Sequence, residues 1–229
     1  MIEALQNIDA SLMLWLNGFH NNFFDVFMFT VSNKLVWIPL DISIFAVIVM
    51  RYGIKPKLLY ILALFGICFA CSDYVCASVI RPIFCRPRPA NADSPIYALV
   101  HIVNNDRGGS YGFPSCHAAN SFMLAALVSL VFRRRYLTIF MYIWAVIHSY
   151  SRIYLGLHYP GDILTGALLG TAISFTFYYI IKRFISYDSE KKTFYPYTII
   201  YTGIAIFLIL IVISCIFDID FLSKTAMFR

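Results

Sequence analysis

Charged residues are scarce in this sequence: only 13% of its 229 residues are Asp, Glu, Lys or Arg, whereas 60% are hydrophobic. A soluble domain usually carries about a quarter charged residues. One core cannot shield so much apolar surface from water. The composition therefore favours a single integral-membrane domain, residues 1–229, over a soluble protein.

Features of several other protein classes are also missing. The first residues, MIEALQNIDA, contain no basic stretch, so we expect no cleaved signal peptide there. The six cysteines and five histidines form no zinc-type cluster. We therefore expect neither a metal nor a cofactor, and we interpret the cysteines as buried thiols. The net charge of +6 comes mostly from short loops between apolar runs, so we expect no nucleic-acid partner.

Six apolar runs have the length of a transmembrane helix, about 20 residues. They cover approximately residues 34–51, 57–80, 116–133, 137–155, 161–183 and 195–217. The pattern predicts an all-α fold, an integral-membrane six-helix bundle over residues 34–217.

The first 31 residues are apolar but are interrupted by NGFHNN. We expect two short helices joined by a turn, both lying along the membrane interface. A seventh, broken span is the alternative.

Basic residues gather in three loops on one side of the predicted bundle. Ten of the 18 lysines and arginines lie there: Arg51, Lys55, Lys57, Arg133, Arg134, Arg135, Lys182, Arg183, Lys191 and Lys192. The positive-inside rule makes this side cytoplasmic. The opposite side holds the longest connection, residues 81–115, and the other eight basic residues: Lys34, Arg81, Arg86, Arg88, Arg107, Arg152, Lys224 and Arg229. Arginines placed against the rule, beside a long loop, indicate a functional site.

Three polar stretches meet on that extracytoplasmic side. They are RPIFCRPRP at residues 81–89, GFPSCHAAN at 112–120 and SRIYLGLHYPGD at 151–162. Segments that are distant in sequence form sites in helical bundles in this way. Arg81, Arg88 and Arg152 supply planar guanidinium groups, which suit phosphate oxygens.

A helix start and two histidines complete the set. Ser115 supplies a hydroxyl, and the backbone amides of Cys116 and His117 begin a helix, where anions bind. His158 is followed four residues later by Asp162, in the first turn of the next helix. Such residues can transfer a phosphoryl group without a metal. One histidine attacks phosphorus, a carboxylate orients it, and the second histidine protonates the leaving oxygen.

At these residues the sequence resembles the type 2 phosphatidic acid phosphatase superfamily, which includes vanadium haloperoxidases and glucose-6-phosphatase. The family signatures are K-x6-R-P, P-S-G-H and S-R-x5-H-x3-D. Here they occur as Arg81-x6-Arg88-Pro89, Pro114-Ser115-Cys116-His117 and Ser151-Arg152-x5-His158-x3-Asp162. The resemblance extends from residue 34 to about residue 185.

The resemblance implies a membrane phosphatase that acts on a phosphorylated lipid. It makes His158 the nucleophile, Asp162 its orienting partner and His117 the general acid. It also implies a set of phosphate-binding residues: Arg81, Arg88, Ser115, Cys116 through its amide, and Arg152. Candidate substrates are undecaprenyl pyrophosphate, phosphatidylglycerol phosphate, phosphatidic acid and a lipid A phosphate. The outward site and the small, bacterial-looking chain favour undecaprenyl pyrophosphate, in a bacterial inner or plasma membrane with the site on its periplasmic or extracellular side.

Two positions depart from the signatures. Arg81 replaces lysine, which keeps the charge but changes its reach and fork geometry. Cys116 replaces glycine and adds a side chain where backbone approaches phosphate, so either the site is narrower or the thiol points away. We do not expect Cys116 to be the nucleophile of a cysteine phosphatase, because the C-x5-R loop of that chemistry is absent.

Other residues receive simpler interpretations. Taken alone, the arginines of residues 81–88 would be interpreted as snorkelling at the interface, and Arg86 is given only a loop or headgroup contact. We expect His148 to be a packing residue, and Asp73 to face the bundle interior behind the site. His20 and His101 are expected on the surface.

Two further functions stay open. A lipid phosphotransferase would use the same phosphohistidine and pass the phosphate to another alcohol. A six-span transporter would need polar residues in the middle of several spans, whereas this polar cluster lies at the outer ends. The sequence indicates no protein partner.

Overall fold

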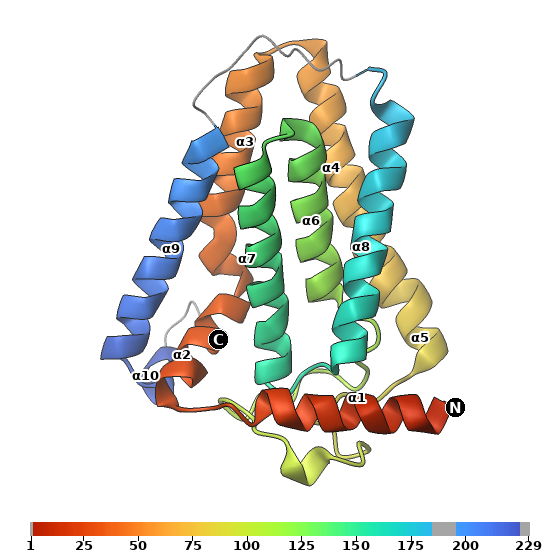
Figure 1. The fold of residues 1–229 in the computed structure, drawn as a ribbon, viewed down its shortest axis with the longest axis vertical. Helices are drawn as coiled ribbons and strands as arrows, with labels where there is room; N and C mark the ends of the chain where they lie inside the picture. The colour runs from red at the N-terminus through yellow and green to blue at the C-terminus, as the bar shows by residue number, and fades with distance from the viewer. Residues whose placement is uncertain (1, 185–195, 225–229) are drawn as a thin grey trace.

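The structure is a computed structural model that describes residues 2–184 and 196–224. In these ranges the regular elements are all helices. One isolated β-bridge, between Pro87 and Tyr111, lies within the long loop. Figure 1 shows the helices α1 (Ile2–Asn17), α2 (Asn22–Ser32), α3 (Ile38–Tyr52), α4 (Pro56–Tyr74), α5 (Arg81–Phe84), α6 (Cys116–Phe132), α7 (Arg135–Tyr154), α8 (Pro160–Ile181), α9 (Pro196–Ile216) and α10 (Ile219–Ser223). Three shorter turns are η1 (Lys34–Trp37), η2 (Val75–Ile80) and η3 (Tyr97–Leu99).

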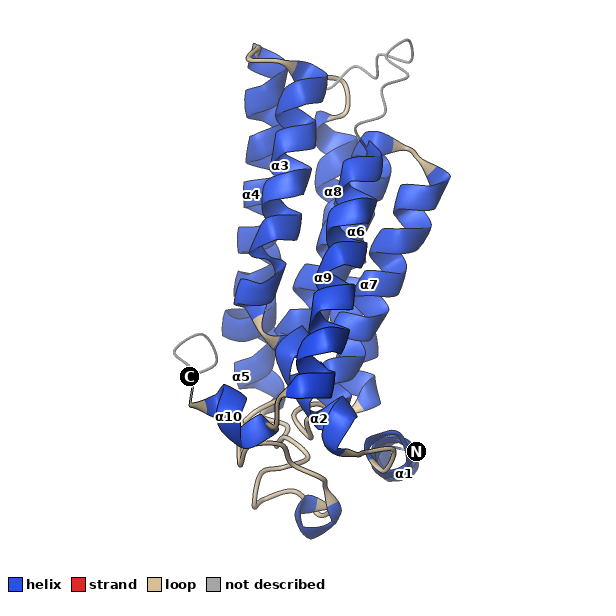
Figure 2. Cartoon of the chain, turned by 90° about the vertical axis from the view of Figure 1, so that its left-hand side faces the viewer, coloured by secondary structure: helices blue, strands red, loops and turns tan. Residues whose placement is uncertain are grey.

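Six long helices, α3, α4, α6, α7, α8 and α9, run side by side and confirm the predicted all-α bundle (Figures 1 and 2). Within the described residues, four helical segments are long and apolar enough to cross a membrane: Lys34–Tyr52, Pro56–Phe84, Pro160–Ile181 and Pro196–Ile216. Helix α6 is apolar but has only 17 residues, and α7 carries polar side chains near its end. All six predicted segments are helical, but they are not six equivalent spans.

The second predicted run is longer than the sequence suggested. Instead of ending at residue 80, the helix continues through η2 and α5 to Phe84. The widened turn of η2, in which the amide of Arg81 donates to the carbonyl of Cys76, comes directly before Pro82, which has no amide hydrogen. Arg81 is therefore held on a helix, and the chain leaves it at Cys85, whose φ is 43°.

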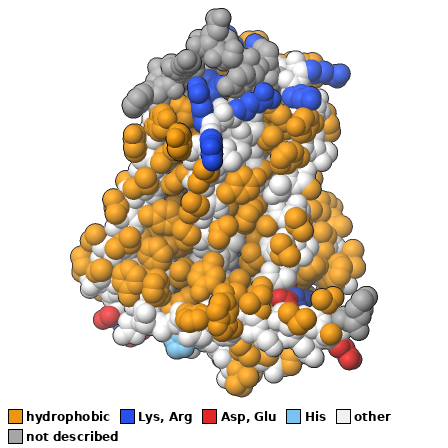
Figure 3. Space-filling model, in the orientation of Figure 1, with side chains coloured by type: hydrophobic (Ala, Val, Ile, Leu, Met, Phe, Trp, Pro, Cys, Tyr) orange, Lys and Arg blue, Asp and Glu red, His pale blue; other side chains and the backbone are white. Residues whose placement is uncertain are grey.

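The exterior of the bundle matches a lipid environment. Figure 3 shows hydrophobic side chains over its sides, with Lys and Arg gathered at the end opposite α1. Exposed examples are Ile42, Leu168 and Leu208, which are 60%, 64% and 58% exposed. Patches of this extent are rare on soluble monomers. The protein is thus an integral membrane protein. Lys191, Lys192 and Arg229 lie outside the described residues.

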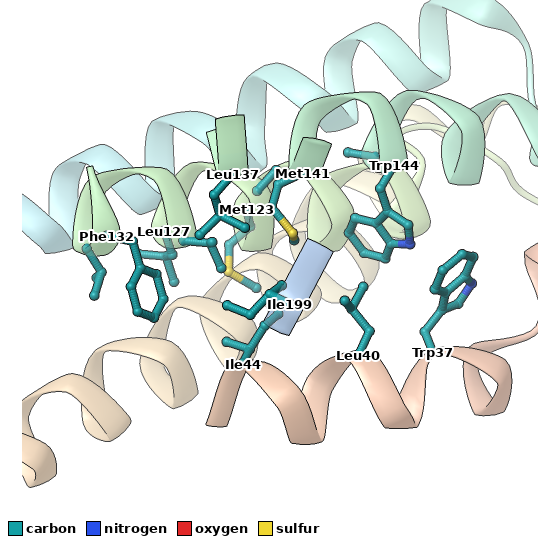
Figure 4. Packing of buried hydrophobic residues seen from close by; sticks show 14 of the residues in the cluster. Trp37, Leu40, Ile44, Met123, Leu127, Phe132, Leu137, Met141, Trp144 and Ile199 are labelled. Atoms are coloured by element: carbon teal, nitrogen blue, oxygen red, sulfur yellow. The ribbon is translucent and has the colours of Figure 1, made fainter. Parts of the chain in front are cut away.

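The interior between α3, α6, α7 and α9 is filled by large apolar side chains (Figure 4). The labelled members are Trp37, Leu40, Ile44, Met123, Leu127, Phe132, Leu137, Met141, Trp144 and Ile199. Interiors packed in this way resist changes in side-chain volume. The core therefore fixes how the helix ends at the site lie relative to one another.

Helices α6 and α8 make the closest approach to one another through two glycines spaced four residues apart. A Cβ atom at Gly166 would overlap the carbonyl oxygen of Ser115, and one at Gly170 would overlap that of Ala119. Small residues at this spacing let helix backbones approach in membranes. At the end of this contact the amide of Ser115 donates to the carbonyl of Asp162 at 3.0 Å. The two helix N-termini are thereby fixed next to each other.

The N-terminal segment forms the two helices and the turn that the sequence predicts. Helix α1 lies across one end of the bundle, and α2 packs against α7 and α9 (Figure 1). The buried Asn17 amide donates to the carbonyl of Tyr154 at 2.7 Å, and its oxygen accepts from the amide of His101. The His101 ring is half-buried against Asp25 at 2.8 Å rather than at the surface. The place of α1 and α2 relative to a bilayer stays a prediction.

The glycine contact between α6 and α8 can be tested by Gly170→Ala, with Gly66→Ala in α4 as its matched control. A methyl at Gly170 meets backbone, so we expect a loss of about 1–3 kcal/mol in the free energy of unfolding. At Gly66 nothing lies within 4 Å, and replacing glycine in a helix interior by alanine is neutral or stabilising. Thermal unfolding in detergent measures both, and equal melting temperatures for the two variants would contradict this packing.

Candidate active site

The predicted site residues come from four segments at the α1 end of the bundle (Figure 1). Arg81 lies on α5, Arg88 in the long loop that follows, and Ser115 with His117 at the start of α6. The third signature spans the end of α7, the short loop after it and the start of α8. Contacts between these segments, described below, bring the signatures together.

His158 and Asp162 form a buried pair. The side chain of His158 is 2% exposed and that of Asp162 is 0% exposed, and Nδ1 lies 3.4 Å from Oδ2. Asp162 Oδ2 also accepts the amide of Tyr159 at 3.0 Å. This is a capping-box arrangement, helped by Pro160 at the first helical position. The sequence YPGD therefore fixes the carboxylate locally, before any tertiary contact is made.

The other ring nitrogen of His158 faces an arginine. Nε2 lies 3.4 Å from Arg88 Nη1. A guanidinium group donates and never accepts, so this nitrogen carries the lone pair, and the ring proton sits on Nδ1 toward Asp162. Burial, followed by the charges of Arg88 and other nearby arginines, holds the pKa of His158 well below its ordinary value. Both effects favour the neutral imidazole, which is the form that can act as a nucleophile.

Three arginines have buried hydrogen-bond donors for which the described part of the chain offers no acceptor. Arg81 donates through Nη2 to the Pro114 carbonyl at 3.2 Å, and Arg152 donates through Nη1 to the hydroxyl of Ser32. The Nε atoms of Arg81, Arg88 and Arg152 are buried and have no hydrogen-bond partner among the described residues. A buried donor left unpaired costs about 1–3 kcal/mol. Guanidinium groups in this condition are suited to a phosphate dianion.

The arginines also influence one another's pKa values. Burial, followed by the charge of Arg81, lowers the pKa of Arg88 from its ordinary value, and the Asp162 carboxylate opposes that shift. Three cations held close together repel, so a dianion placed among them is favoured by more than its individual hydrogen bonds.

His117 is held in a stack of rings. Its ring lies 5.7 Å from that of His148, which stacks in turn on Trp144 at 5.4 Å. The hydroxyl of Ser121 donates to the His117 carbonyl, so its oxygen accepts from His148 Nδ1 at 2.8 Å. His148 is thus a hydrogen-bonded packing residue, as the sequence suggested, and it orders His117. Ser115 caps α6 by accepting the amide of Ala118.

The thiol of Cys116 points toward η2 and α5. Its Sγ lies 2.9 Å from Arg81 Nη2 and hydrogen-bonds the buried thiol of Cys76. The two departures from the family signatures, Arg81 and Cys116, are therefore in direct contact. The sequence left two outcomes for Cys116, a narrower site or a thiol that points away. The structure shows the second, with the thiol turned toward Arg81 and Cys76.

Arg86 has a role that the sequence did not reveal. Its Nη1 donates to Asp162 Oδ1 at 2.9 Å, and its Nη2 lies 2.7 Å from Asp9 Oδ2 on α1. The guanidinium carbon lies 3.9 Å from the centre of the Tyr159 ring, and Asp9 also accepts the amide of Gly161 at 2.8 Å. The expected loop or headgroup contact was wrong: Arg86 ties α1 to the buried carboxylate. These partners are distant in sequence, so only its position between the two signature arginines could have drawn attention to it.

Gly112 was also missed. A Cβ atom there would lie 3.0 Å from Asp162 Oδ2 and 3.4 Å from His158 Nδ1. The absence of a side chain lets the long loop close over the pair. Asp73 was expected to face the bundle interior behind the site, but it is exposed. It accepts a hydrogen bond from Asn120 at 3.4 Å and lines a cavity next to His117.

Comparisons with known proteins agree with this geometry. The profile described as PAP2 superfamily matches residues 57–186. A lipid A 4′-phosphatase of Bacteroides thetaiotaomicron is 45% identical over 183 residues, covering 80% of this chain and 81% of the relative. A lipid A 4′-phosphatase of Porphyromonas gingivalis is 32% identical over 75% of this chain and 72% of its own length.

A solved structure has the same fold. The crystal structure of a transmembrane PAP2 type phosphatidylglycerolphosphate phosphatase from Bacillus subtilis superposes with a TM-score of 0.57 at 24% identity. The superposition covers 79% of this chain and 87% of the other. The chain therefore belongs to the PAP2 superfamily, as a membrane lipid phosphatase of that type.

Proposed function

We propose that this phosphatase hydrolyses the 4′-phosphate of lipid A at the extracytoplasmic face, through a phosphohistidine formed on His158. The substrate is supported by the 45% identity to a lipid A 4′-phosphatase over most of both chains. Lipid A thus replaces undecaprenyl pyrophosphate, the substrate that the sequence alone favoured. The outward orientation is supported by the position of the site at the end opposite the basic loops (Figure 3).

One observation carries the chemistry. The buried His158 presents Nε2 to Arg88, one of three arginines whose Nε donors have no partner within the described ranges. A nucleophile and a set of anion-binding donors that face each other at one point are what phosphoryl transfer requires.

The reaction runs in two steps. His158 Nε2 forms a bond to phosphorus while the bond from phosphorus to the lipid oxygen breaks, and His117 gives that oxygen a proton. A water molecule then attacks phosphorus and gives a proton to His117, while the bond from phosphorus to Nε2 breaks, so inorganic phosphate leaves and both histidines return to their starting states. Asp162, opposite Nδ1, stabilises the positive ring that exists between the steps.

The phosphate-binding residues act on the transferring group. Arg81, Arg88 and Arg152 stabilise the charge on the equatorial oxygens, with the hydroxyl of Ser115 and the amide of Cys116 at the start of α6. Arg86 does not touch the phosphate. It positions Asp162, which in turn holds His158.

Substitution of the histidines tests these assignments. His158→Ala removes the nucleophile, and we expect phosphate release from lipid A in detergent micelles to fall by at least ~10³-fold. His117→Ala removes the proton donor and should lower the rate by about 10²–10⁴-fold. His20→Ala, on an exposed histidine, is the control. EDTA should leave the wild-type rate unchanged, and a near-normal rate in His158→Ala would overturn the nucleophile.

The role of Arg86 predicts a fall in turnover rather than in affinity. Arg86→Ala leaves the buried Asp162 carboxylate without its ion-pair partner, so kcat should drop by about 10-fold or more. Since Arg86 is kept away from the phosphate, KM should change little, and Arg86→Lys should restore part of kcat. Arg135→Ala, on an exposed arginine at the opposite end of the bundle, is the matched control. A rise in KM with kcat preserved would make Arg86 a substrate-binding residue instead.

The protonation state of His158 can be measured directly. Burial and the neighbouring cations lower its pKa, so the neutral form must persist as the pH falls. In protein labelled with ¹⁵N-histidine, the signal that disappears in His158→Gln should show a neutral ring at pH 6, below the ordinary histidine pKa of about 6.5. Protonation at or above pH 6.5 would contradict the electrostatics of the site.

A further inference from the structure

A cavity of about 460 Å³ opens next to the site, between α3, α4, α6 and α7. Cys116 and His117 lie in its wall, so the cavity borders the site at the start of α6. Pockets that bind small organic groups have volumes of this order, about 300–1,000 Å³. The phosphoryl chemistry described above does not use this space.

The wall of the cavity contains polar atoms without partners. The indole Nε1 of Trp144, a residue 4% exposed, and the Oδ1 of Asn120 are buried and have no hydrogen-bond partner among the described residues. The neighbouring Trp37 differs, because its Nε1 donates to the Val31 carbonyl at 2.8 Å. One free donor and one free acceptor in the same wall indicate a ligand that carries both, as a hydroxyl group does.

The charge of the cavity is opposite to that of the phosphate site. Its wall holds two carboxylates, Asp41 and Asp73, against the single ammonium of Lys34. Carboxylates accept hydrogen bonds from hydroxyls but repel a second phosphate. The Trp37 and Trp144 rings, 5.5 Å apart and nearly perpendicular (Figure 4), add flat apolar surface. Carboxylates, an amide and indole rings together suit a carbohydrate.

The position of His117 decides which part of the substrate occupies the cavity. Its ring belongs to the wall, and a proton donor must lie within hydrogen-bond distance of the leaving oxygen. The group attached to that oxygen therefore extends into the cavity, on the side away from the arginines.

We propose that this cavity binds the leaving group and selects an uncharged, hydroxyl-bearing one, a sugar, over a phosphorylated one. A phosphate ester on a sugar leaves behind a neutral alcohol, which Asp73, Asn120 and Trp144 bind. A lipid pyrophosphate leaves behind a lipid phosphate, whose charge the carboxylates oppose. This proposal rests on the proposed function and deepens it, because it names the residues that make the enzyme select lipid A over undecaprenyl pyrophosphate.

The test compares two substrates on the full chain in detergent micelles, with kcat/KM for phosphate release measured for lipid A and for undecaprenyl pyrophosphate. Wild type should prefer lipid A. Asp73→Asn should reduce that preference by about 10-fold or more, because it weakens the bond to a hydroxyl and removes a charge that repels phosphate. Its matched control is Asp93→Asn, on an exposed loop carboxylate, which should keep the wild-type preference.

A second variant tests the same proposal in case Asp73→Asn does not fold. Trp144→Phe keeps an aromatic ring but removes the N–H donor together with part of the ring surface. It should raise KM for lipid A by about 5-fold, the equivalent of one hydrogen bond, with a smaller effect on undecaprenyl pyrophosphate.

The outcomes separate the two proposals. If wild type releases phosphate from lipid A but Asp73→Asn and Trp144→Phe leave the ratio of the two substrates unchanged, the cavity proposal is wrong and the function stands. If wild type acts on undecaprenyl pyrophosphate and not on lipid A, both are wrong.

Discussion

The site depends on one backbone hydrogen bond, from the amide of Ser115 to the carbonyl of Asp162 at 3.0 Å. It joins the first turn of α6 to the first turn of α8, and so joins the second signature to the third. The bond can form only because Gly166 and Gly170 let the two helix backbones touch. The position of His117, at the start of α6, relative to His158, just before α8, depends on that contact. In this protein, the packing of α6 against α8 therefore also sets the geometry of the proposed catalytic residues.

The arginines at this end of the bundle divide into two kinds according to their partners. Arg86 is neutralised on both sides, by Asp9 and by Asp162. Arg81, Arg88 and Arg152 form no ion pair among the described residues, and their buried Nε atoms remain free. The difference has a physical consequence. A paired guanidinium stiffens a carboxylate, whereas an unpaired one in a buried site lowers the energy of an arriving anion.

Much of this arrangement was predictable, and what was not has a common cause. The helices follow from apolar runs of membrane length, and Asp162 is fixed by a local YPGD cap, so both can be found from neighbouring residues. The Arg86 contacts with Asp9 and Asp162 join three segments that meet only after folding. Gly112 was missed for the same reason, since its importance lies in what a side chain would meet. The extension of α4 to Phe84 was hidden by Pro82, which usually ends a helix but follows a widened turn here.

The replacement of the family glycine by Cys116 can be explained in two steps. A glycine is required where φ is positive or where there is no room for a Cβ. Cys116 is absent from the positive-φ residues of the described chain and begins an ordinary helix, so the backbone makes no such demand. Room exists because the thiol turns toward α5, where it meets Arg81. Arginine at this position uses one nitrogen, Nη2, for both the thiol and the Pro114 carbonyl. Its Nε, a donor that lysine lacks, stays buried without a partner among the described residues. The two departures thus compensate one another, and the side chain of Cys116 does not turn toward the proposed phosphate position.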